Sequence, residues 1–373
     1  MLTVIFHINT LRFAVPAAAL MGLGPQYLTL IVGWRLASVL MPTRWFRAGD
    51  DCIWGTYQRF IEFFFEHFTG VEVVLSGDVD DLKKENVLYL SNHQSTMDWI
   101  VADMLAIRTG CLGRMRYVLK DGLKYMPLYG FYFGLHGCLY VKRSNKFNER
   151  NINRCKRQLA SFEHHKTPVW MVIFPEGTRY NPEKKKALEL SQDFARSKDL
   201  SILHNVLSPR YRATNLCIQG LRKHYDAIYD VTIAYGGTGE EVEGQVSKVT
   251  RQKAPSIPDY LMGQCSQVHI HLKRRPLEDV PEDETGVHKW LHGIFEEKDK
   301  LLEEFYSNDP NKRGRLGDNP RVSKLSLSKT LPAVLFSCGI GIPMLLTQPC
   351  RQIYWKIWMF GTLFCSLYMR VTT

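Results

Sequence analysis

A histidine and an aspartate five residues apart in VLYLSNHQSTMD, residues 87–98, could form a catalytic pair. His93 follows a short apolar run that predicts a buried strand, and Asp98 lies in the first turn of a helix predicted over 96–108. In that arrangement the carboxylate can reach back to the imidazole, fix its tautomer and leave the other ring nitrogen free as a base. The alternative is a structural histidine beside a helix-start aspartate, which is the commoner situation for an isolated pair.

Basic residues at the ends of predicted strands could bind a phosphate group. Arg143 ends one apolar run and Arg179 follows another, and a guanidinium offers paired donors that match phosphate oxygens. Lys120 closes a third run. For each of these residues a solvated surface charge is the alternative. Gly177, two residues before Arg179, permits a backbone conformation that other residues avoid.

Two further groups of residues invite a chemical interpretation. The backbone N–H groups of the turn before Thr96 are candidate donors to an oxyanion, and Ser95 is expected to cap the helix. His269 and His271 alternate with apolar residues, so both point to one face of a predicted strand. They could resemble a metal pair, but no third ligand is evident, and a structural role is favoured.

Three ordered blocks resemble the glycerolipid acyltransferases, the family that includes the 1-acylglycerol-3-phosphate acyltransferases. They lie about 40 residues apart and read Asn92-His93-x4-Asp98, Gly137-CLYVK-Arg143 and Phe174-PEGT-Arg179. The longer runs 92–100 and 174–181, together with an apolar C-terminal tail, look most like the epsilon-type members. A fourth block of the family is matched poorly, by Pro209 alone, which leaves acyl and acceptor selectivity open.

The resemblance implies transfer of an acyl chain from acyl-CoA, a co-substrate, to the sn-2 hydroxyl of 1-acylglycerol 3-phosphate (lysophosphatidic acid), giving phosphatidic acid. It implies no bound cofactor and no metal. His93 would be the base and Asp98 its orienting partner. The substrate-binding residues that it implies are Lys120, Gly137, Tyr140, Arg143, Glu176, Gly177, Thr178 and Arg179. The alternatives are acylation of other lysophospholipids, such as lysocardiolipin, and a catalytically silent lipid-binding membrane protein.

Strands alternate with helices between Val71 and Tyr306, which predicts an α/β layered domain whose mostly parallel sheet is flanked by helices. Side chains that follow parallel strands meet at one edge of such a sheet, where sites form. His93, Arg143 and Glu176 each end or follow a predicted strand. The predicted strands are 71–76, 87–91, 115–120, 138–143, 169–174, 228–235 and 267–273, and the predicted helices are 96–108, 148–165, 183–198, 213–225 and 284–306.

Apolar segments at both ends predict contact with a membrane. Phe13–Trp34 is long enough to cross a bilayer, although glycines and prolines interrupt it, and 331–346 and 353–369 predict a membrane hairpin. Phe60–Phe68 suits either an interfacial helix or a helix packed on the domain. The predicted regions are 1–70, an N-terminal membrane anchor with interfacial helices; 71–307, the acyltransferase domain; 308–330, a basic linker; and 331–373, the C-terminal hairpin.

The net charge and the cysteines indicate which class of partner the protein binds and in which redox compartment it lies. A net charge of +11 over 373 residues suits an anionic partner such as a lipid headgroup. The sequence contains no zinc-ligand spacing and no RNP-like block, so nothing in it indicates nucleic-acid binding. Nine scattered cysteines favour a reducing, cytosol-like environment. With the resemblance, we expect an integral membrane protein of the endoplasmic reticulum, nuclear envelope or mitochondrion that contacts membrane lipids and directs its catalytic domain to the cytosol.

Overall fold

The computed structural model describes residues 2–142, 149–241 and 249–372. The chain forms two compact units, each assembled from separated segments. Unit 1 comprises Met1–Phe68, Ala106–Met171 and Leu325–Thr373, and unit 2 comprises Thr69–Leu105 and Val172–Lys324. Helix α4 (Asp98–Thr109) and strand β5 (Trp170–Ile173) run from one unit into the other. The four predicted regions are contiguous in sequence, unlike the units, and their boundaries stay a prediction.

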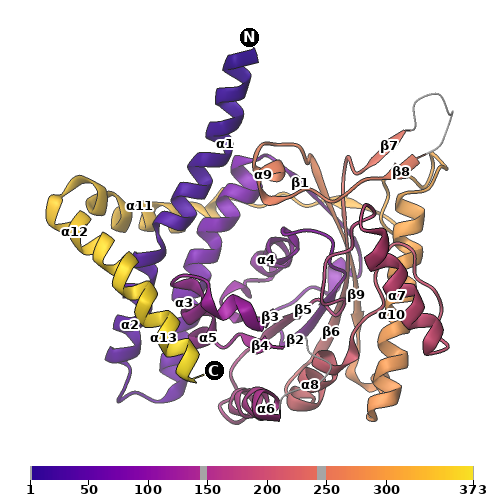
Figure 1. The fold of residues 1–373 in the computed structure, drawn as a ribbon, viewed down its shortest axis with the longest axis horizontal. Coiled ribbons are helices and arrows are strands. Elements are labelled where there is room, and N and C mark those ends of the chain that lie inside the picture. The colour runs from indigo at the N-terminus through magenta and orange to yellow at the C-terminus, as the bar shows by residue number, and fades with distance from the viewer. Residues whose placement is uncertain (1, 143–148, 242–248, 373) are drawn as a thin grey trace. The chain divides into compact units, whose positions relative to one another are not determined.

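Unit 2 is built on neighbouring strands in the order β10-β1-β9-β6-β2, and Figure 1 labels all of them except β10. β1 pairs in parallel with β9, and β2 in parallel with β6, whereas β6 and β9 are antiparallel, as are β1 and β10. The strands are β1 (Glu72–Gly77), β2 (Val87–Ser91), β6 (Ala227–Tyr235), β9 (Gln267–Arg275) and β10 (Arg321–Val322). β10 falls within the segment predicted to be a linker.

The prediction of an α/β fold is confirmed, and the sheet is mixed: β6 and β9, like β1 and β10, pair antiparallel beside the parallel pairs. The connection from β6 to β9 contains the hairpin β7 (Gly239–Glu241) and β8 (Val249–Arg251), followed by the five-residue helix α9 (Ile257–Leu261). It has no long crossover helix among its described residues. Parallel neighbours need such a crossover and antiparallel neighbours do not, so β9 returns in the opposite direction. The apolar pattern of a strand indicates that the strand is buried. It does not determine whether the strand runs parallel or antiparallel to its neighbour.

The two strands that lead to the candidate site are central and buried. All five residues of β2 and all nine of β6 are buried, as expected for strands covered on both faces. Helix α10 (Glu284–Phe305) packs on β6 and on α8 (Tyr211–Leu221) (Figure 1). Asp283 caps the first turn of α10 by accepting a hydrogen bond from the backbone of Gly286 at 2.8 Å. Helix α7 (Lys185–Ser197) also belongs to this unit.

Unit 1 combines the terminal helices with the middle of the chain. Helix α3 contacts both α2 and α11, helix α13 contacts α5, and β3 pairs in parallel with β4. The elements of this unit are α1 (Leu2–Gly22), α2 (Gly24–Ala37), α3 (Thr43–Glu62), β3 (Met115–Lys120), α5 (Tyr129–His136), β4 (Leu139–Val141), α6 (Glu149–His164), α11 (Leu331–Leu346), α12 (Gln348–Lys356) and α13 (Thr362–Thr372).

One helical stretch of the described chain, Thr10–Ala37, is by itself long and apolar enough to cross a membrane. Leu331–Leu346 and Gln348–Thr372 meet the requirement for length and apolar character only as a pair, and they are bent by 105°. The predicted C-terminal membrane hairpin therefore stays a prediction. The helices α11–α13 nevertheless expose large apolar side chains to solvent, among them Leu335, Leu345, Trp355, Phe360, Phe364 and Leu367.

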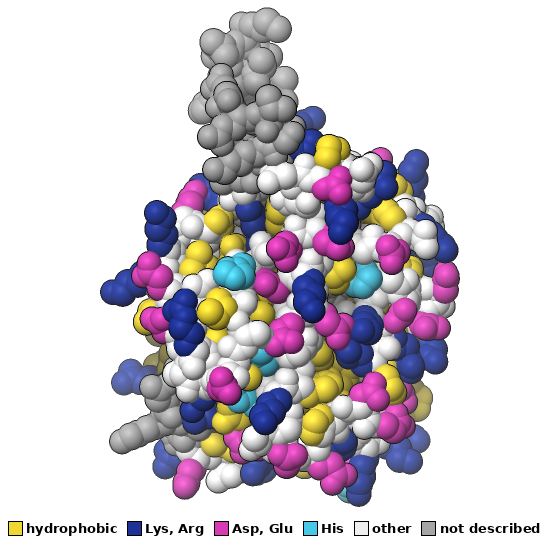
Figure 2. Space-filling model, turned by 90° about the vertical axis from the view of Figure 1, so that its right-hand side faces the viewer, with side chains coloured by type: hydrophobic (Ala, Val, Ile, Leu, Met, Phe, Trp, Pro, Cys, Tyr) yellow, Lys and Arg dark blue, Asp and Glu magenta, His cyan; other side chains and the backbone are white. Residues whose placement is uncertain are grey.

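Each predicted strand and each predicted helix between 71 and 306 is present in the described chain, with small shifts at the ends. The sequence patterns missed α5 and the short elements β7, β8, α9 and β10. Figure 2 shows the face on the side of α7 and α10, where basic and acidic side chains are mixed and hydrophobic side chains form small groups. On this face the excess positive charge is not gathered into one patch.

Candidate active site

His93 and Asp98 form the predicted hydrogen-bonded pair. Nδ1 of His93 lies 2.7 Å from Oδ2 of Asp98. A carboxylate only accepts, so the proton sits on Nδ1 and Nε2 presents a lone pair. Among the described residues Nε2 has no partner, and the His93 side chain is 22% exposed. The ring stacks on Phe174 with 4.8 Å between ring centroids, which fixes its plane.

Asp98 also accepts backbone hydrogen bonds from the turn that carries His93. The N–H groups of Gln94 and Ser95 donate to Oδ2 of Asp98 at 2.7 and 2.9 Å. Helix α4 begins at Asp98 itself, two residues later than predicted, and the hydroxyl of Ser95 accepts from the N–H of Met97 at 3.0 Å within the preceding turn. The expectation that this turn offers oxyanion donors is wrong for these two N–H groups, because the carboxylate already occupies them.

Tyr235 is a part of the site that the sequence analysis missed. Its hydroxyl donates to Oδ1 of Asp98 at 2.6 Å, so both carboxylate oxygens have partners. Burial, reinforced by the charge of Asp98, raises the pKa of Tyr235 well above its ordinary value, and the hydroxyl therefore stays protonated as a donor. Tyr235 ends β6, whose parallel pairing with β2 places both carboxyl ends at one edge. Its position at the carboxyl end of a strand is the signal by which the sequence could have indicated Tyr235 as a site residue.

Asn92 extends the pairing of β2 beyond the strand. Its side-chain amide accepts from the N–H of Ile233 at 2.8 Å and donates to the carbonyl of the same residue at 3.0 Å, as a backbone peptide group would. The side chain of Gln94 donates to the same carbonyl at 2.7 Å. The turn that holds His93 is thus fixed to β6 on both sides of the histidine.

Glu176 joins the third sequence block to the first. Its Oε1 accepts from the backbone N–H of His93 at 2.6 Å, and its Oε2 accepts from the N–H of Leu207 at 2.9 Å. The N–H of Tyr180 donates to the carbonyl of His93 at 2.7 Å. Glu176 is 2% exposed, so its side chain holds the histidine backbone rather than facing a substrate. Burial raises the pKa of Glu176 to about 8, although the two N–H donors lower it.

The rest of the third block is a tight, exposed turn. Gly177 has φ of +70°, the left-handed conformation that its predicted role requires, and its N–H donates to the carbonyl of Phe174 at 3.1 Å. Thr178 and Arg179 are exposed. Among the described residues Arg179 has no acidic partner, so its guanidinium is available to a ligand. Unit 2 thus brings together His93, Asp98, Glu176, Gly177, Thr178 and Arg179.

The other candidate residues belong to unit 1, except that Arg143 lies outside the described residues. Lys120 is exposed at the end of β3, paired in register with Val141. Gly137 ends α5 with φ of +111°, and a Cβ there would lie 2.7 Å from the ring of Phe162. Tyr140 is 2% exposed, and its hydroxyl donates to the carbonyl of Gly130 at 2.6 Å, a contact that the sequence analysis did not foresee.

Arg251 on β8 is a second residue that the sequence analysis missed. Its guanidinium donates to Oε1 of Gln94 and to the carbonyl of Asn205, each at 2.7 Å. It lies over the rings of Tyr180 and Tyr306, at 4.1 and 4.5 Å from their centroids. The positive charge lowers the pKa of Glu176, against the larger effect of burial. No local sequence pattern indicates this role, because the four partners come from distant segments.

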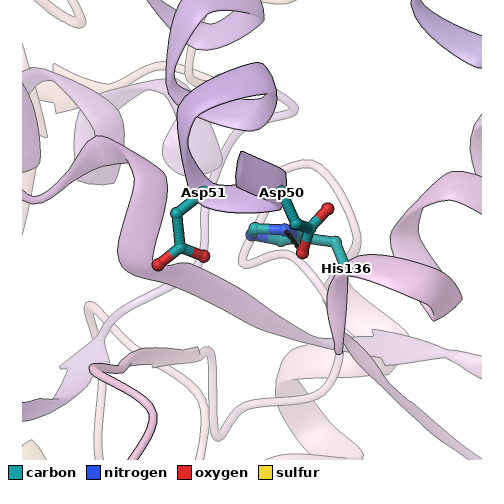
Figure 3. Close-up of side chains that lie close together, drawn as sticks. All are labelled: Asp50, Asp51 and His136. Carbon is teal, nitrogen blue, oxygen red and sulfur yellow. Dashed lines mark hydrogen bonds and ion pairs between the residues drawn. The ribbon is translucent and has the colours of Figure 1, made fainter. Parts of the chain in front are cut away.

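Asp50, Asp51 and His136 in unit 1 lie close enough to suggest a metal site, with ligand atoms within 4.8 Å of one another (Figure 3). Their hydrogen bonds indicate a buried charge network instead. His136 places Nδ1 2.9 Å from Asp50 and Nε2 2.9 Å from the carbonyl of Met115, so Nε2 carries a proton. Arg116 donates to Asp51 at 2.5 Å. A buried arginine supplies the positive charge that a metal would bring.

His269 and His271 have the structural surroundings that were favoured. His269 is 5% exposed and packs against Phe305 at 5.0 Å between ring centroids, and burial lowers its pKa to about 4. His271 places Nδ1 3.1 Å from the hydroxyl of Ser76. Among the described residues no third metal-ligating side chain joins them.

Comparisons with known proteins point to one family. Residues 70–206 match the family model described as "Acyltransferase", and residues 259–336 match the one described as "Acyltransferase C-terminus". The 1-acyl-sn-glycerol-3-phosphate acyltransferase epsilon of Mus musculus is 45% identical over 99% of this chain and 98% of its own length. The probable 1-acyl-sn-glycerol-3-phosphate acyltransferase 5 of Arabidopsis thaliana is 33% identical over 76% of this chain and 70% of its own length.

Among solved structures, the 1-acyl-sn-glycerophosphate (LPA) acyltransferase PlsC from Thermotoga maritima has a TM-score of 0.45 and 16% identity, over 79% of this chain and 98% of that one. The mouse relative matches this chain at a much higher identity and almost from end to end. The chain therefore belongs to the 1-acyl-sn-glycerol-3-phosphate acyltransferase family, in which it is epsilon-like.

Proposed function

We propose that this chain transfers an acyl group from acyl-CoA to the sn-2 hydroxyl of 1-acylglycerol 3-phosphate and releases phosphatidic acid and coenzyme A. The observation that supports this most is the His93–Asp98 pair, with Nδ1 held at 2.7 Å and Nε2 open among the described residues. Family membership supports the same reaction, because the relatives are named for it.

In the proposed reaction Nε2 of His93 takes the proton of the acceptor hydroxyl as its oxygen attacks the thioester carbonyl. The resulting imidazolium is stabilised by the carboxylate of Asp98, which is itself fixed by Tyr235 and by two N–H groups. When the tetrahedral intermediate collapses, the C–S bond breaks and the imidazolium returns its proton to the departing sulfur. A base positioned in this way contributes about 10²–10⁴-fold in rate.

We propose Arg179 as a ligand of the acceptor phosphate. It is exposed three residues after Glu176, the residue whose carboxyl group holds the backbone of His93, and it has no acidic partner among the described residues. The phosphate would then bind beside the histidine. Lys120 and Arg143 remain proposed substrate ligands from the resemblance, since each carries a positive charge; Lys120 lies at the end of β3, and Arg143 lies outside the described residues.

We propose that Glu176 acts by positioning rather than by contact with substrate. Both of its oxygens accept backbone N–H groups, and one of these belongs to His93. Gly177 permits the turn that follows, which leaves Thr178 and Arg179 exposed. Gly137 and Tyr140 would support their own segment of unit 1, since Tyr140 is buried and uses its hydroxyl on Gly130.

We propose an internal membrane, namely endoplasmic reticulum, nuclear envelope or mitochondrion, with the catalytic histidine on the cytosolic side. The apolar stretch Thr10–Ala37 and the exposed apolar side chains of α11–α13 support membrane attachment. Nine cysteines without a disulfide suit a reducing compartment. Protease protection in sealed microsomes tests the orientation, and complete protection of residues 69–324 would contradict it.

The decisive experiment is an assay of the purified full-length protein in lipid with labelled acyl-CoA and a panel of lysophospholipids. We expect 1-acylglycerol 3-phosphate to be the best acceptor, and we expect His93→Ala to abolish transfer in a protein that still folds, although the loss of the hydrogen bond to Asp98 should lower its unfolding temperature. A higher rate with lysocardiolipin would reassign the acceptor. No transfer to any acceptor by folded protein would favour the catalytically silent lipid-binding alternative.

A further inference from the structure

Unit 1 contains a groove of about 560 Å³ that the catalytic residues do not use. Three helices line it, namely α2, α3 and α11, together with the turn that precedes α11. Its volume lies within the range of about 300–1,000 Å³ that is typical of ligand sites. A hydrogen bond of 3.1 Å between the hydroxyls of Tyr27 on α2 and Ser337 on α11 holds two of the walls together.

The lining combines apolar walls with two positive charges. Tyr27, Leu30, Ile53 and Phe336 are among the side chains that give the apolar surface. Arg59 and Lys329 also line the groove, whereas no aspartate or glutamate does. Neither cation has an acidic partner among the described residues. The groove therefore suits a ligand with an apolar chain and an anionic group.

The location of these walls favours a lipid over a water-soluble ligand. Helix α2 is part of the stretch Thr10–Ala37, which is long and apolar enough to cross a membrane. Helix α11 exposes Leu335 and Phe336, and it belongs to the apolar C-terminal pair of helices. A bilayer that contacts these helices supplies acyl chains to the groove directly, and its phosphates would lie at the level of the cations.

We propose that this groove binds one phospholipid of the surrounding bilayer, with an acyl chain against Tyr27 and Phe336 and an anionic headgroup phosphate on Arg59 and Lys329. The guanidinium of Arg59 lies against Gly55, one turn earlier on α3, where a Cβ would be 3.0 Å from Nη1. This is a binding site for a resident lipid. It does not rest on the proposed function, since it requires no turnover at His93.

Cys52 provides a probe inside the groove, because it is an exposed, free cysteine that lines it. Of the other eight cysteines, only Cys338 and Cys350 are not buried. The full-length protein with Cys338→Ser and Cys350→Ser is labelled at Cys52 with a small fluorophore. Phosphatidic acid and phosphatidylcholine, each with the same dibrominated chains, are then titrated in nanodiscs, because bromine quenches the fluorophore on contact.

We expect saturable quenching by phosphatidic acid at a mole fraction roughly 25-fold lower than for phosphatidylcholine, which corresponds to about fivefold for each of two cations. Arg59→Ala with Lys329→Ala should remove most of this preference. The control is the double variant Arg44→Ala with Lys356→Ala. It also removes two positive charges, at exposed positions of unit 1 outside the groove, and it should retain the preference for phosphatidic acid. The same result is expected in a His93→Ala background, which separates this test from the acyltransferase assay.

Thr56→Trp is designed to fill the groove and should reduce quenching by both lipids. If that variant does not fold, the paired cation variants decide the question alone. Equal quenching by the two lipids, or an equal effect of the groove pair and the control pair, overturns the proposal. Quenching by dibrominated acyl-CoA or lysophosphatidate at lower concentration than by the two-chain phospholipid also overturns it, because the groove would then be a substrate site.

Discussion

The hydroxyl of Tyr235 lies 2.6 Å from Oδ1 of Asp98, while Nδ1 of His93 lies 2.7 Å from Oδ2 of the same carboxylate. One buried carboxylate therefore joins the end of β6 to the turn after β2. Its orientation is set from both sides, since a carboxylate with one free oxygen could rotate away from the imidazole. Tyr235 is a positioning residue in this arrangement, acting on the histidine through Asp98.

Tyr235→Phe should lower kcat roughly tenfold and leave KM for the acceptor nearly unchanged, because only the orientation of the base is loosened. The loss of a hydrogen bond to a charged group should also lower the free energy of unfolding by about 1.5–3 kcal/mol. Steady-state kinetics and thermal unfolding measure the two effects.

Tyr229→Phe is the matched control, since Tyr229 is a buried residue of the same strand whose hydroxyl donates to Glu85 at 2.7 Å. It should lose stability with no change in kcat. Equal effects of the two variants on kcat would show that Tyr235 is merely structural.

Arg179→Lys should raise KM for 1-acylglycerol 3-phosphate about tenfold with a smaller change in kcat, because a point charge replaces a paired donor. Arg196→Lys, at an exposed position on α7, serves as the control and should behave like the parent protein. The effect is measured as KM for 1-acylglycerol 3-phosphate and for 1-acylglycerol, an acceptor that lacks the phosphate. If the variant weakens both acceptors equally, Arg179 does not bind the phosphate.

Much of the site could be predicted because it is local in sequence. His93 and Asp98 are separated by one turn, and a strand followed by a turn and a helix leaves few ways to arrange them. The left-handed turn at Gly177 was also predictable, since glycine adopts that conformation without strain. Alternation of apolar segments was sufficient to identify the strands and helices between 71 and 306, because burial produces that pattern.

The remaining features depend on contacts between distant segments, which the patterns do not encode. Tyr235 reaches Asp98 across 137 positions of sequence, and Glu176 reaches the N–H of His93 across 83. Tyr140 is a candidate substrate-binding residue from the sequence, and the hydrogen bond of its hydroxyl to Gly130 is a contact that the patterns do not indicate. The antiparallel direction of β9 follows from its connection to β6, and the apolar pattern of a strand is the same in either direction.

Glu176→Gln should change how stability depends on pH. Burial raises the pKa of Glu176 in the folded protein from the ordinary value of 4.5 to about 8. Between these values the folded state holds a proton that the unfolded state has lost, so the contribution of this group to stability is present at low pH and declines as pH rises. Glutamine cannot titrate and lacks this decline.

The unfolding temperatures of the parent protein and Glu176→Gln, measured in the same detergent from pH 5 to pH 8, test this expectation. The parent protein should lose stability relative to the variant by up to about 1.4 kcal/mol per pH unit. Parallel curves for the two proteins would mean that the carboxyl group is ionised throughout this range, held as a carboxylate by the N–H groups of His93 and Leu207.

Asp98→Asn tests the catalytic pair itself. The amide can still accept hydrogen bonds at its oxygen, but it carries no charge to stabilise the imidazolium, and it can donate to Nδ1 and so select the wrong tautomer. We expect kcat to fall by at least about 10²-fold, with acceptor binding largely intact.

Thermal unfolding measured beside kcat separates catalysis from simple misfolding, because a folded Asp98→Asn variant with a low kcat has lost the charge that stabilises the imidazolium. Asp103→Asn is a matched control, since Asp103 is a buried aspartate on the same helix α4 and does not contact His93. An Asp98→Asn enzyme with full kcat would show that the pair is structural. The proton taken from the acceptor hydroxyl would then need a base other than His93, and the proposed mechanism would have to be abandoned.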